Sequence, residues 1–215
     1  MFKFLASTLT LSALLAVPTA SHAVIYTFNA SLSGAKEVPV VGSGATATGT
    51  AILDYNDQGT LSLADDTYNF SMAVFGLTGG TGGRAANAFH IHGAANASEN
   101  GPVRVSLDNP AVFTFLNTGS NLLVGGINVP APGMLTATVS PPALPNMGYP
   151  SMSFLDMLRS GLTYVNVHTT LNPAGAVRGQ LIEVSMVPEP STYAMLLAGM
   201  GALVLITRRR RTNQA

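Results

Sequence analysis

The chain has 215 residues with ten basic and ten acidic side chains, and it contains no cysteine and no tryptophan. The absence of cysteine excludes disulfides, thiol catalysis, iron–sulfur clusters and cysteine zinc sites. Residues 24–187 hold five basic residues against nine acidic ones, a net charge of about −4, which argues against a nucleic-acid partner because such a partner requires a basic face.

Residues 1–23 have the three parts of a secretory signal peptide. They begin with the basic Lys3, continue through a short apolar run, and end with Ser21 and Ala23 as small residues at the −3 and −1 positions. We expect cleavage after Ala23, which removes one of the four histidines. An uncleaved membrane anchor is the alternative, but the apolar run is short for a membrane span.

The chain then changes to short runs in which apolar and polar residues alternate, bounded by Gly, Asn and Asp. This period-two pattern is typical of strands with one buried face, and its repetition at short intervals favours a sandwich or barrel. The sequence therefore predicts one all-β domain over residues 24–187. The expected strands lie at residues 25–32, 46–53, 60–63, 68–75, 88–93 and 163–169.

One short helix is predicted within this β domain. Ser153 and Asp156 form the S-x-x-D pattern of a capping box, and Gly161 supplies a C-terminal stop, so the helix spans about two turns. The preceding stretch, residues 130–150, is rich in proline and is predicted to be an irregular surface excursion.

The remaining three histidines lie in two short runs, "AFHIHG" at residues 88–93 and "YVNVHT" at residues 164–169. Side chains alternate between the two faces of a strand, so His90 and His92 share one face of the first run. Asn166 and His168 share the corresponding face of the second. The apolar residues between them are predicted to face the core.

Two interpretations of these histidines stay open. His90, His92 and His168 could converge on one copper or zinc ion, with Asn166 or Glu37 donating or accepting the hydrogen bond that fixes a ring. The other interpretation is that they are polar residues bonded to loops, which serve only the fold. Similar residues follow both runs, which indicates an internal two-fold made of two hairpins.

Motifs of other catalytic classes are missing from the sequence. There is no glycine-framed serine elbow of a hydrolase, and no pair among the acidic residues stands out as the two carboxylates of a glycosidase. The glycine-rich run at residues 79–83 lacks the lysine of a phosphate-binding loop and is predicted to be a turn. A protein without enzymatic activity is the expectation.

The C-terminal segment, residues 188–215, has three consecutive parts. These are Pro188-Glu189-Pro190, an apolar stretch at residues 193–207 expected to form a transmembrane helix, and the cluster Arg208, Arg209, Arg210 and Arg211 on its cytoplasmic side. This order resembles the PEP-CTERM sorting signal of Gram-negative bacteria. The resemblance implies an exosortase-type protease as partner, transient anchoring in the membrane, and release to the cell surface or extracellular matrix. A simple anchor is the alternative.

The central domain resembles the CHRD family over about residues 25–184. The resemblance rests on residues 32–39, on His-Ile-His-Gly at 90–93, on Asn-Val-His-Thr at 166–169 and on Arg-Gly-Gln at 178–180. It implies an immunoglobulin-like or superoxide-dismutase-like antiparallel β-sandwich. Most members of the family lack an established activity. The chain departs from the family at Ala176, where a glutamate is usual.

The resemblance also links Glu37 and Arg178, and we expect them to approach each other as a structural pair, since a buried glutamate needs a partner. The sequence thus predicts an exported structural or binding module that contacts matrix polysaccharide or surface proteins. The alternative is an extracytoplasmic protein that binds copper or zinc. A copper–zinc dismutase uses more histidines than three and normally carries a disulfide, which disfavours redox catalysis.

Overall fold

The computed structural model describes residues 23–41, 46–135, 149, 151–184 and 199–200. The sorting motif Pro188-Glu189-Pro190, the arginine cluster at 208–211 and nearly all of the predicted signal peptide and transmembrane segment therefore lie outside the described residues. Within the described residues, no helix has the length and hydropathy needed to cross a membrane.

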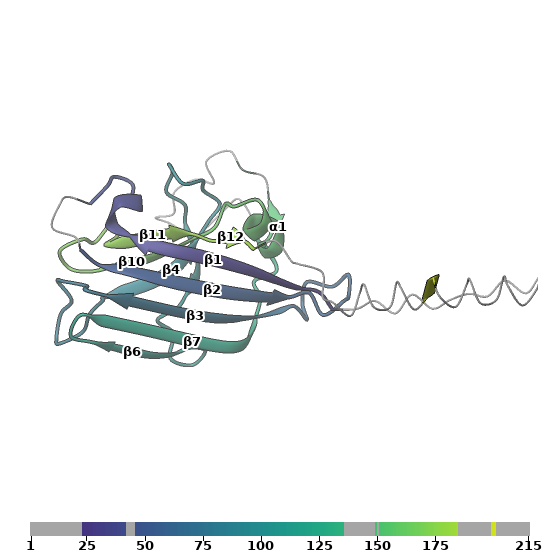
Figure 1. The fold of residues 1–215 in the computed structure, drawn as a ribbon, viewed down its shortest axis with the longest axis horizontal. Coiled ribbons are helices and arrows are strands. Elements are labelled where there is room, and N and C mark those ends of the chain that lie inside the picture. Colours follow the sequence, from purple (N-terminus) through teal and green to yellow (C-terminus); the bar gives the residue numbers. More distant parts are fainter. Residues whose placement is uncertain (1–22, 42–45, 136–148, 150, 185–198, 201–215) are drawn as a thin grey trace, which may run out of the picture.

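Strands are the main regular structure of the described domain (Figure 1). The elements are β1 (Ile25–Ser33), the 3-10 turn η1 (Gly34–Lys36), β2 (Thr48–Asn56), β3 (Thr67–Phe75), β4 (Ala88–His92), β5 (Val103–Ser106), β6 (Thr114–Thr118), β7 (Asn121–Pro130), β8 (Met134–Leu135), β9 (Met152–Ser153), α1 (Phe154–Arg159), β10 (Tyr164–His168), β11 (Val177–Gln180) and β12 (Ile182–Glu183).

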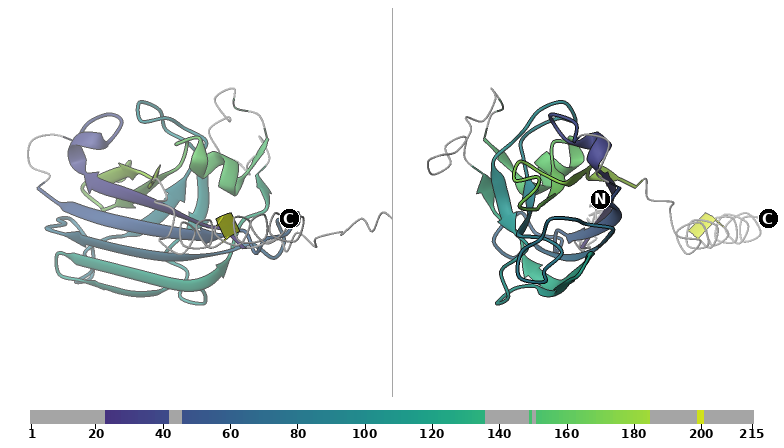
Figure 2. Two further views of the ribbon diagram at one scale, coloured as in Figure 1. Left: turned by 45° about the vertical axis from the view of Figure 1, so that its right-hand side comes forward. Right: turned by 90° about the vertical axis from the view of Figure 1, so that its left-hand side faces the viewer.

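Ten of these strands form one antiparallel sheet, in the order β5-β4-β10-β11-β1-β2-β3-β7-β6, with β12 also paired to β1. The described chain thus has the predicted all-β, antiparallel character with one short α-helix. These ten strands form a continuous sheet that curls around its interior (Figure 2), and β8 and β9 form a separate two-stranded sheet. β1 and β11 join the two halves at the single register pair Ser33 and Arg178. The finer subdivision into an immunoglobulin-like or superoxide-dismutase-like sandwich stays a prediction.

The curl brings β6, at one end of the strand order, close to β4 near the other end. The rings of Phe89 in β4 and Phe115 in β6 meet edge to face with centroids 5.3 Å apart. Asn117 of β6 reaches the backbone just before β4: its Oδ1 accepts from the amides of Ala85 (2.8 Å) and Ala86 (2.9 Å), and its Nδ2 donates to the Ala86 carbonyl (2.9 Å). The Asn117 side chain therefore connects β6 to the segment before β4, although β4 and β6 are not paired as neighbouring strands in the sheet.

The core follows from the alternation of the strands. Phe28, Leu53 and Phe70 of β1 to β3 form one buried cluster with Ile91 of β4 and Val165 of β10. Each fully buried side chain of this size contributes about 1.5–3 kcal/mol relative to exposure. The predicted core-facing residues of both histidine runs are confirmed, because the side chains at positions 89, 91, 165 and 167 are at most 1% exposed.

The strand predicted at residues 60–63 is wrong, because these residues form turns between β2 and β3. The Thr60 hydroxyl donates to the Asp65 carboxylate and accepts from the Ser62 amide, and Leu61 projects fully into solvent. Local side-chain bonding of this kind competes with strand pairing. The strand predicted to end at residue 53 instead continues to Asn56.

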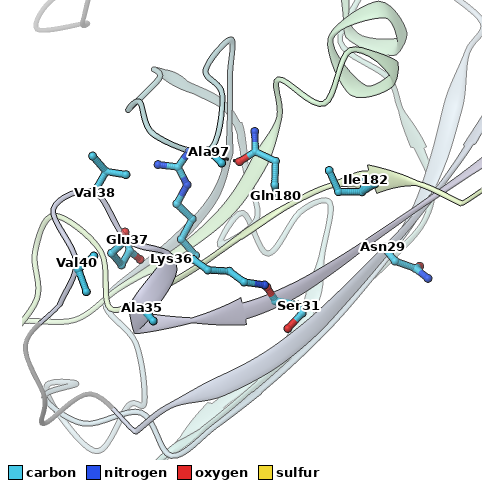
Figure 3. A pocket seen from close by; sticks show the side chains of 11 residues that line it. Asn29, Ser31, Ala35, Lys36, Glu37, Val38, Val40, Ala97, Gln180 and Ile182 are labelled. Carbon is cyan, nitrogen blue, oxygen red and sulfur yellow. Dashed lines mark hydrogen bonds between the residues drawn. The ribbon is translucent and has the colours of Figure 1, made fainter.

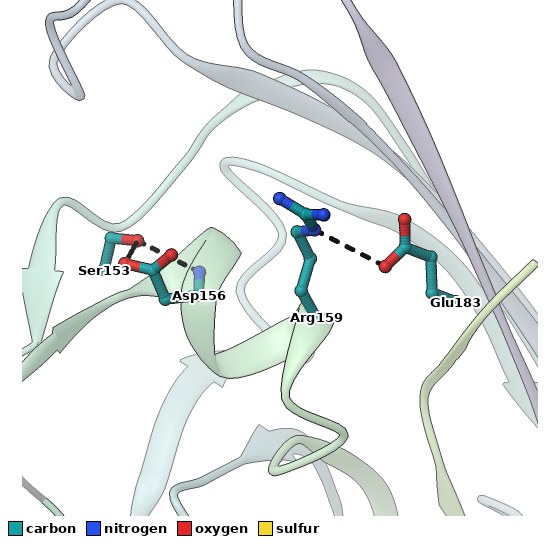
Figure 4. Close-up of polar contacts among 4 residues, drawn as sticks. All are labelled: Ser153, Asp156, Arg159 and Glu183. Carbon is teal, nitrogen blue, oxygen red and sulfur yellow. Dashed lines mark hydrogen bonds and ion pairs between the residues drawn. The ribbon is translucent and has the colours of Figure 1, made fainter.

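Helix α1 is confirmed with the predicted caps (Figure 4). The Ser153 hydroxyl accepts from the Asp156 amide (3.0 Å) and donates to the Asp156 carboxylate (2.7 Å), and Gly161 has a positive φ of 66°. The helix has six residues, slightly less than the predicted two turns. Arg159 and Glu183, 3.5 Å apart, attach it to β12 through a partly exposed ion pair, worth at most about 1 kcal/mol.

Candidate metal centre

The three histidines of the central domain come together on one face of two neighbouring strands. His90 and His92 lie on β4 and His168 lies on β10, and these strands pair antiparallel with His90 opposite Asn166. The prediction that the two runs are strands of one sheet is confirmed. The ring centroids are 5.2 to 5.7 Å apart, and one nitrogen of each ring lies within 4.8 Å of the other two.

Two of the rings are held by backbone carbonyls. Nδ1 of His92 lies 2.9 Å from the carbonyl oxygen of Gly101, and Nδ1 of His168 lies 3.1 Å from that of Pro173. A carbonyl only accepts, so each Nδ1 carries the proton and each Nε2 keeps its lone pair. The carbonyls of Gly101 and Pro173 therefore orient the two rings, a role that we expected Asn166 or Glu37 to have. That expectation is wrong for His92 and His168. Backbone carbonyls are the same in every residue, so the sequence pattern does not reveal which of them bonds a ring.

Three buried nitrogens of the cluster have no hydrogen-bond partner among the described residues. They are Nδ1 of His90 and Nε2 of His92 and His168. Buried polar atoms are nearly always paired, because leaving one unpaired costs about 1–3 kcal/mol. Three such atoms at one place are therefore unusual for residues that serve only the fold.

Burial keeps the imidazoles neutral. It lowers the pKa of His92 to about 3, more than the opposing effect of the Gly101 carbonyl. Burial also lowers the pKa of His90, with a further contribution from His168, and lowers that of His168. Asp108 acts in the opposite direction on His90 and His168. Neutral rings with free lone pairs are the form in which histidine binds a metal ion.

The loop at residues 93–102 covers this face of the sheet and is held there by β11. Arg178 is 1% exposed and donates to the carbonyls of Asn96 and Glu99, both at 2.8 Å, and to Oδ1 of Asn100 at 3.1 Å. Gln180 donates to the carbonyl of Ala95 at 2.8 Å. Since the same loop supplies the Gly101 carbonyl, β11 indirectly sets the position of the His92 ring.

Tyr164 connects the arginine to the histidines. Its ring stacks on His92 with centroids 5.0 Å apart and an interplanar angle of 13°, and the guanidinium carbon of Arg178 lies 3.5 Å from its ring centre. Its hydroxyl accepts from the Gly101 amide at 3.0 Å. Sequence reasoning missed this role of Tyr164; its place two residues before Asn166, on the same strand face, was the available signal.

Glu37 and Arg178 both line a cavity of about 550 Å³. Figure 3 shows Glu37 and its labelled neighbours in this cavity. Glu37 and Arg178 do not form an ion pair within 4.0 Å. Among the described residues, the ion pair within this distance is Arg159–Glu183. The carboxylate accepts from Nδ2 of Asn166 at 3.4 Å. Burial raises the pKa of Glu37 to about 7, against smaller lowering effects of Arg178 and Asn166.

The Glu37 carboxylate packs against the backbone of Gly175. A Cβ at Gly175 would lie 2.4 Å from Oε2 of Glu37, and this glycine has a φ of 151°, a value that favours glycine. Ala176, which follows it, is buried and belongs to the hydrophobic core.

The two hairpins resemble each other in their turns as well as in their strands. The carbonyls of Asn96 and Asn172, each four residues after a histidine, accept from the amides of Glu99 (3.2 Å) and Gly175 (3.1 Å). His92 and His168 occupy equivalent positions in the two hairpins. These contacts agree with the predicted internal two-fold.

The fold and the histidine-bearing face of β4 and β10 define the class of protein: an all-β domain with three neutral imidazoles gathered on a curled antiparallel sheet. Comparison with protein families identifies the chain more closely. The CHRD domain matches residues 28–181, and the chain belongs to the CHRD family. The PEP-CTERM protein-sorting motif matches residues 187–211. This motif marks an exported protein of Gram-negative bacteria that passes through a membrane-anchored stage and is recognised by exosortase-type machinery.

Comparisons with curated proteins and with solved structures gave no match. The family and the sorting motif therefore identify the chain as an exported, sorted CHRD-domain protein, and its binding role is argued from the residues of the site.

Proposed function

We propose that this protein is an exported, non-enzymatic binding module that holds a copper or zinc ion through His90, His92 and His168. After cleavage near Pro188-Glu189-Pro190 the domain of residues 24–187 is released from its C-terminal segment to the cell surface or extracellular matrix. The observation that carries the metal-binding proposal is the gathering of three imidazoles, with one nitrogen of each within 4.8 Å of the other two, in a cluster where each ring has a buried nitrogen without a hydrogen-bond partner.

The hydrogen bonds of the rings support a metal rather than a purely structural role. A histidine that serves only the fold is expected to satisfy both nitrogens or to expose one to water. Here Nδ1 of His92 and of His168 donates to a loop carbonyl, while Nε2 of each ring lacks a partner. Metal-binding histidines have this arrangement, in which the second nitrogen fixes the ring by donating to a carbonyl or carboxylate.

The donor set favours copper or zinc. Imidazole nitrogen suits both ions, with bonds of about 2.0–2.1 Å to zinc, whereas magnesium and calcium require oxygen ligands. The three nitrogens, within 4.8 Å of one another, need a small inward movement of the rings to reach such bonds. His92 and His168 are each hydrogen-bonded at Nδ1 only, so small rotations of these side chains can supply that movement.

The test is elemental analysis of untagged full-length protein exported to the periplasm, before and after incubation with Cu(II) or Zn(II). A variant with His90, His92 and His168 all replaced by glutamine keeps polar side chains of similar size. Glu37→Gln is the matched control, because Glu37 contacts Asn166 beside the cluster but offers no ring nitrogen.

We expect about one metal ion per chain in the natural protein and in the control, and none in the triple variant. If the natural protein holds no metal even after incubation, the metal proposal is wrong. The histidines then serve the fold, and the search moves to matrix polysaccharides and surface proteins as partners.

A further inference from the structure

A cavity of about 510 Å³ lies directly over the histidine cluster. Its wall includes His90, His92 and His168 together with Val103, Thr170 and Pro173. The imidazoles therefore form part of the wall of a space open to ligands from outside, and anything bound between them faces this space.

The three ring nitrogens can occupy only one side of a metal ion. All three come from one face of the adjacent strands β4 and β10, so they approach an ion from the side of the sheet. Within the described residues, no fourth histidine and no carboxylate belongs to the group. Copper and zinc take four or more ligands, so at least one position is left without a protein donor.

The charges around the cluster favour an anion at this position. Three neutral imidazoles leave the double positive charge of the ion uncompensated. Among the described residues, no carboxylate belongs to the group of ligating side chains, so the group itself does not neutralise the ion.

We propose that the metal ion keeps an open position directed into this cavity, and that a small monodentate anion binds there. The inference rests on the metal-binding function proposed above. The cavity admits the anion from solvent, the ion binds it directly, and the sheet blocks the opposite side.

Val103 provides a way to close the cavity without touching a metal ligand. It lies on the edge strand β5 opposite His92, and it is 41% exposed. A phenylalanine at this position extends over the cluster and fills the space above the ion. Val112 is also 41% exposed and does not line this cavity, so Val112→Phe is the matched control.

The experiment loads the full chain with one equivalent of Cu(II) and titrates it with sodium azide. Electron paramagnetic resonance reports nitrogen ligation before azide is added, and optical absorption reports an azide-to-copper charge-transfer band. We expect three-nitrogen ligation, then a saturable band with a changed resonance spectrum. Val103→Phe should bind copper with unchanged affinity and azide at least tenfold more weakly, and Val112→Phe should match the natural protein.

The outcomes separate the two proposals. Absence of specific copper ligation contradicts the proposed function itself. Copper bound by three nitrogens but unaffected by azide overturns the open position while the metal site stands. Equal azide affinity in Val103→Phe and Val112→Phe overturns the assignment of the open position to this cavity.

Discussion

Two polar clusters lie side by side on the outer face of β4, β10 and β11, and they differ in how their polar atoms are satisfied. Arg178 and Gln180 donate to carbonyl oxygens of the covering loop at 2.8 Å, and Gln180 also donates to the carbonyl of Gly161 at 2.7 Å. The histidine cluster has one ring nitrogen bonded on each of His92 and His168 and leaves three others without partners.

The difference is the basis for assigning a structural role to one cluster and for proposing a ligand at the other. A buried charge must find several partners, and Arg178 finds them in the loop, so its interactions are complete. His92 is held by the same loop through the Gly101 carbonyl and His168 by the carbonyl of Pro173, yet each keeps a buried nitrogen without a partner. For this reason we propose different roles for the two clusters, although they lie on neighbouring strands.

The largest expected effect comes from removing the arginine. Arg178→Met leaves the carbonyls of Asn96 and Glu99 without their donor, and we expect a loss of about 3–5 kcal/mol in the free energy of unfolding. Urea denaturation in the presence of EDTA measures this loss free of any metal. A loss below about 1 kcal/mol would contradict the structural role.

Gly175→Ala tests the packing of Glu37 and should cost about 2–4 kcal/mol, because the new Cβ would meet the carboxylate. Gly82→Ala is the matched control: Gly82 also has a positive φ, 63°, but nothing lies near its Cβ position. It should cost only about 1–2 kcal/mol from backbone strain.

A second variant isolates the contact itself. Combining Gly175→Ala with Glu37→Ala removes the atoms with which the Cβ collides, so the double variant should be more stable than the sum of the single losses predicts. Strict additivity in thermal or urea denaturation would show that the carboxylate is not what requires glycine at position 175.

Metal binding should stabilise the natural protein and not a histidine variant. At a free Cu(II) or Zn(II) concentration 100 times the dissociation constant, linkage gives about 2.7 kcal/mol of added stability. His168→Gln should lose most of this gain, while its stability in EDTA changes by less than about 1 kcal/mol. Denaturation curves with and without metal measure both quantities; an equal gain in the variant would exclude His168 as a ligand.

The smallest effect per pH unit is the contribution of Glu37 to the pH dependence of stability. Its pKa is raised from 4.5 to about 7, so between these values the unfolded chain releases a proton that the folded chain keeps. The contribution of Glu37 to the free energy of unfolding therefore falls as pH rises through this window, by at most about 1.4 kcal/mol per pH unit. The buried histidines, whose pKa values are lowered, contribute in the opposite direction. Urea denaturation at pH 4.5 to 7 should therefore give Glu37→Gln a more positive slope of stability against pH than the natural protein; equal slopes in the two proteins would show that Glu37 does not contribute.

The sequence by itself determined the features that depend on neighbouring residues. Period-two alternation placed Phe89 and Ile91 in the core and His90 and His92 on the opposite face, because successive side chains of a strand point to opposite sides. Ser153 and Asp156 predicted the helix start, since a cap acts within one turn. Alternation failed at residues 60–63, where hydroxyl and carboxylate groups bond locally into turns.

Tertiary structure alone decided what depends on distant residues. The pairing of β4 with β10 brought His168 to His90 and His92, and the curl let Asn117 hold the backbone before β4. The carbonyl of Gly101, in the loop that Arg178 holds, bonds Nδ1 of His92 and so leaves Nε2 of that ring without a partner. Backbone carbonyls are present in every residue and leave no pattern in the sequence, so their partners become visible only when the chain has folded.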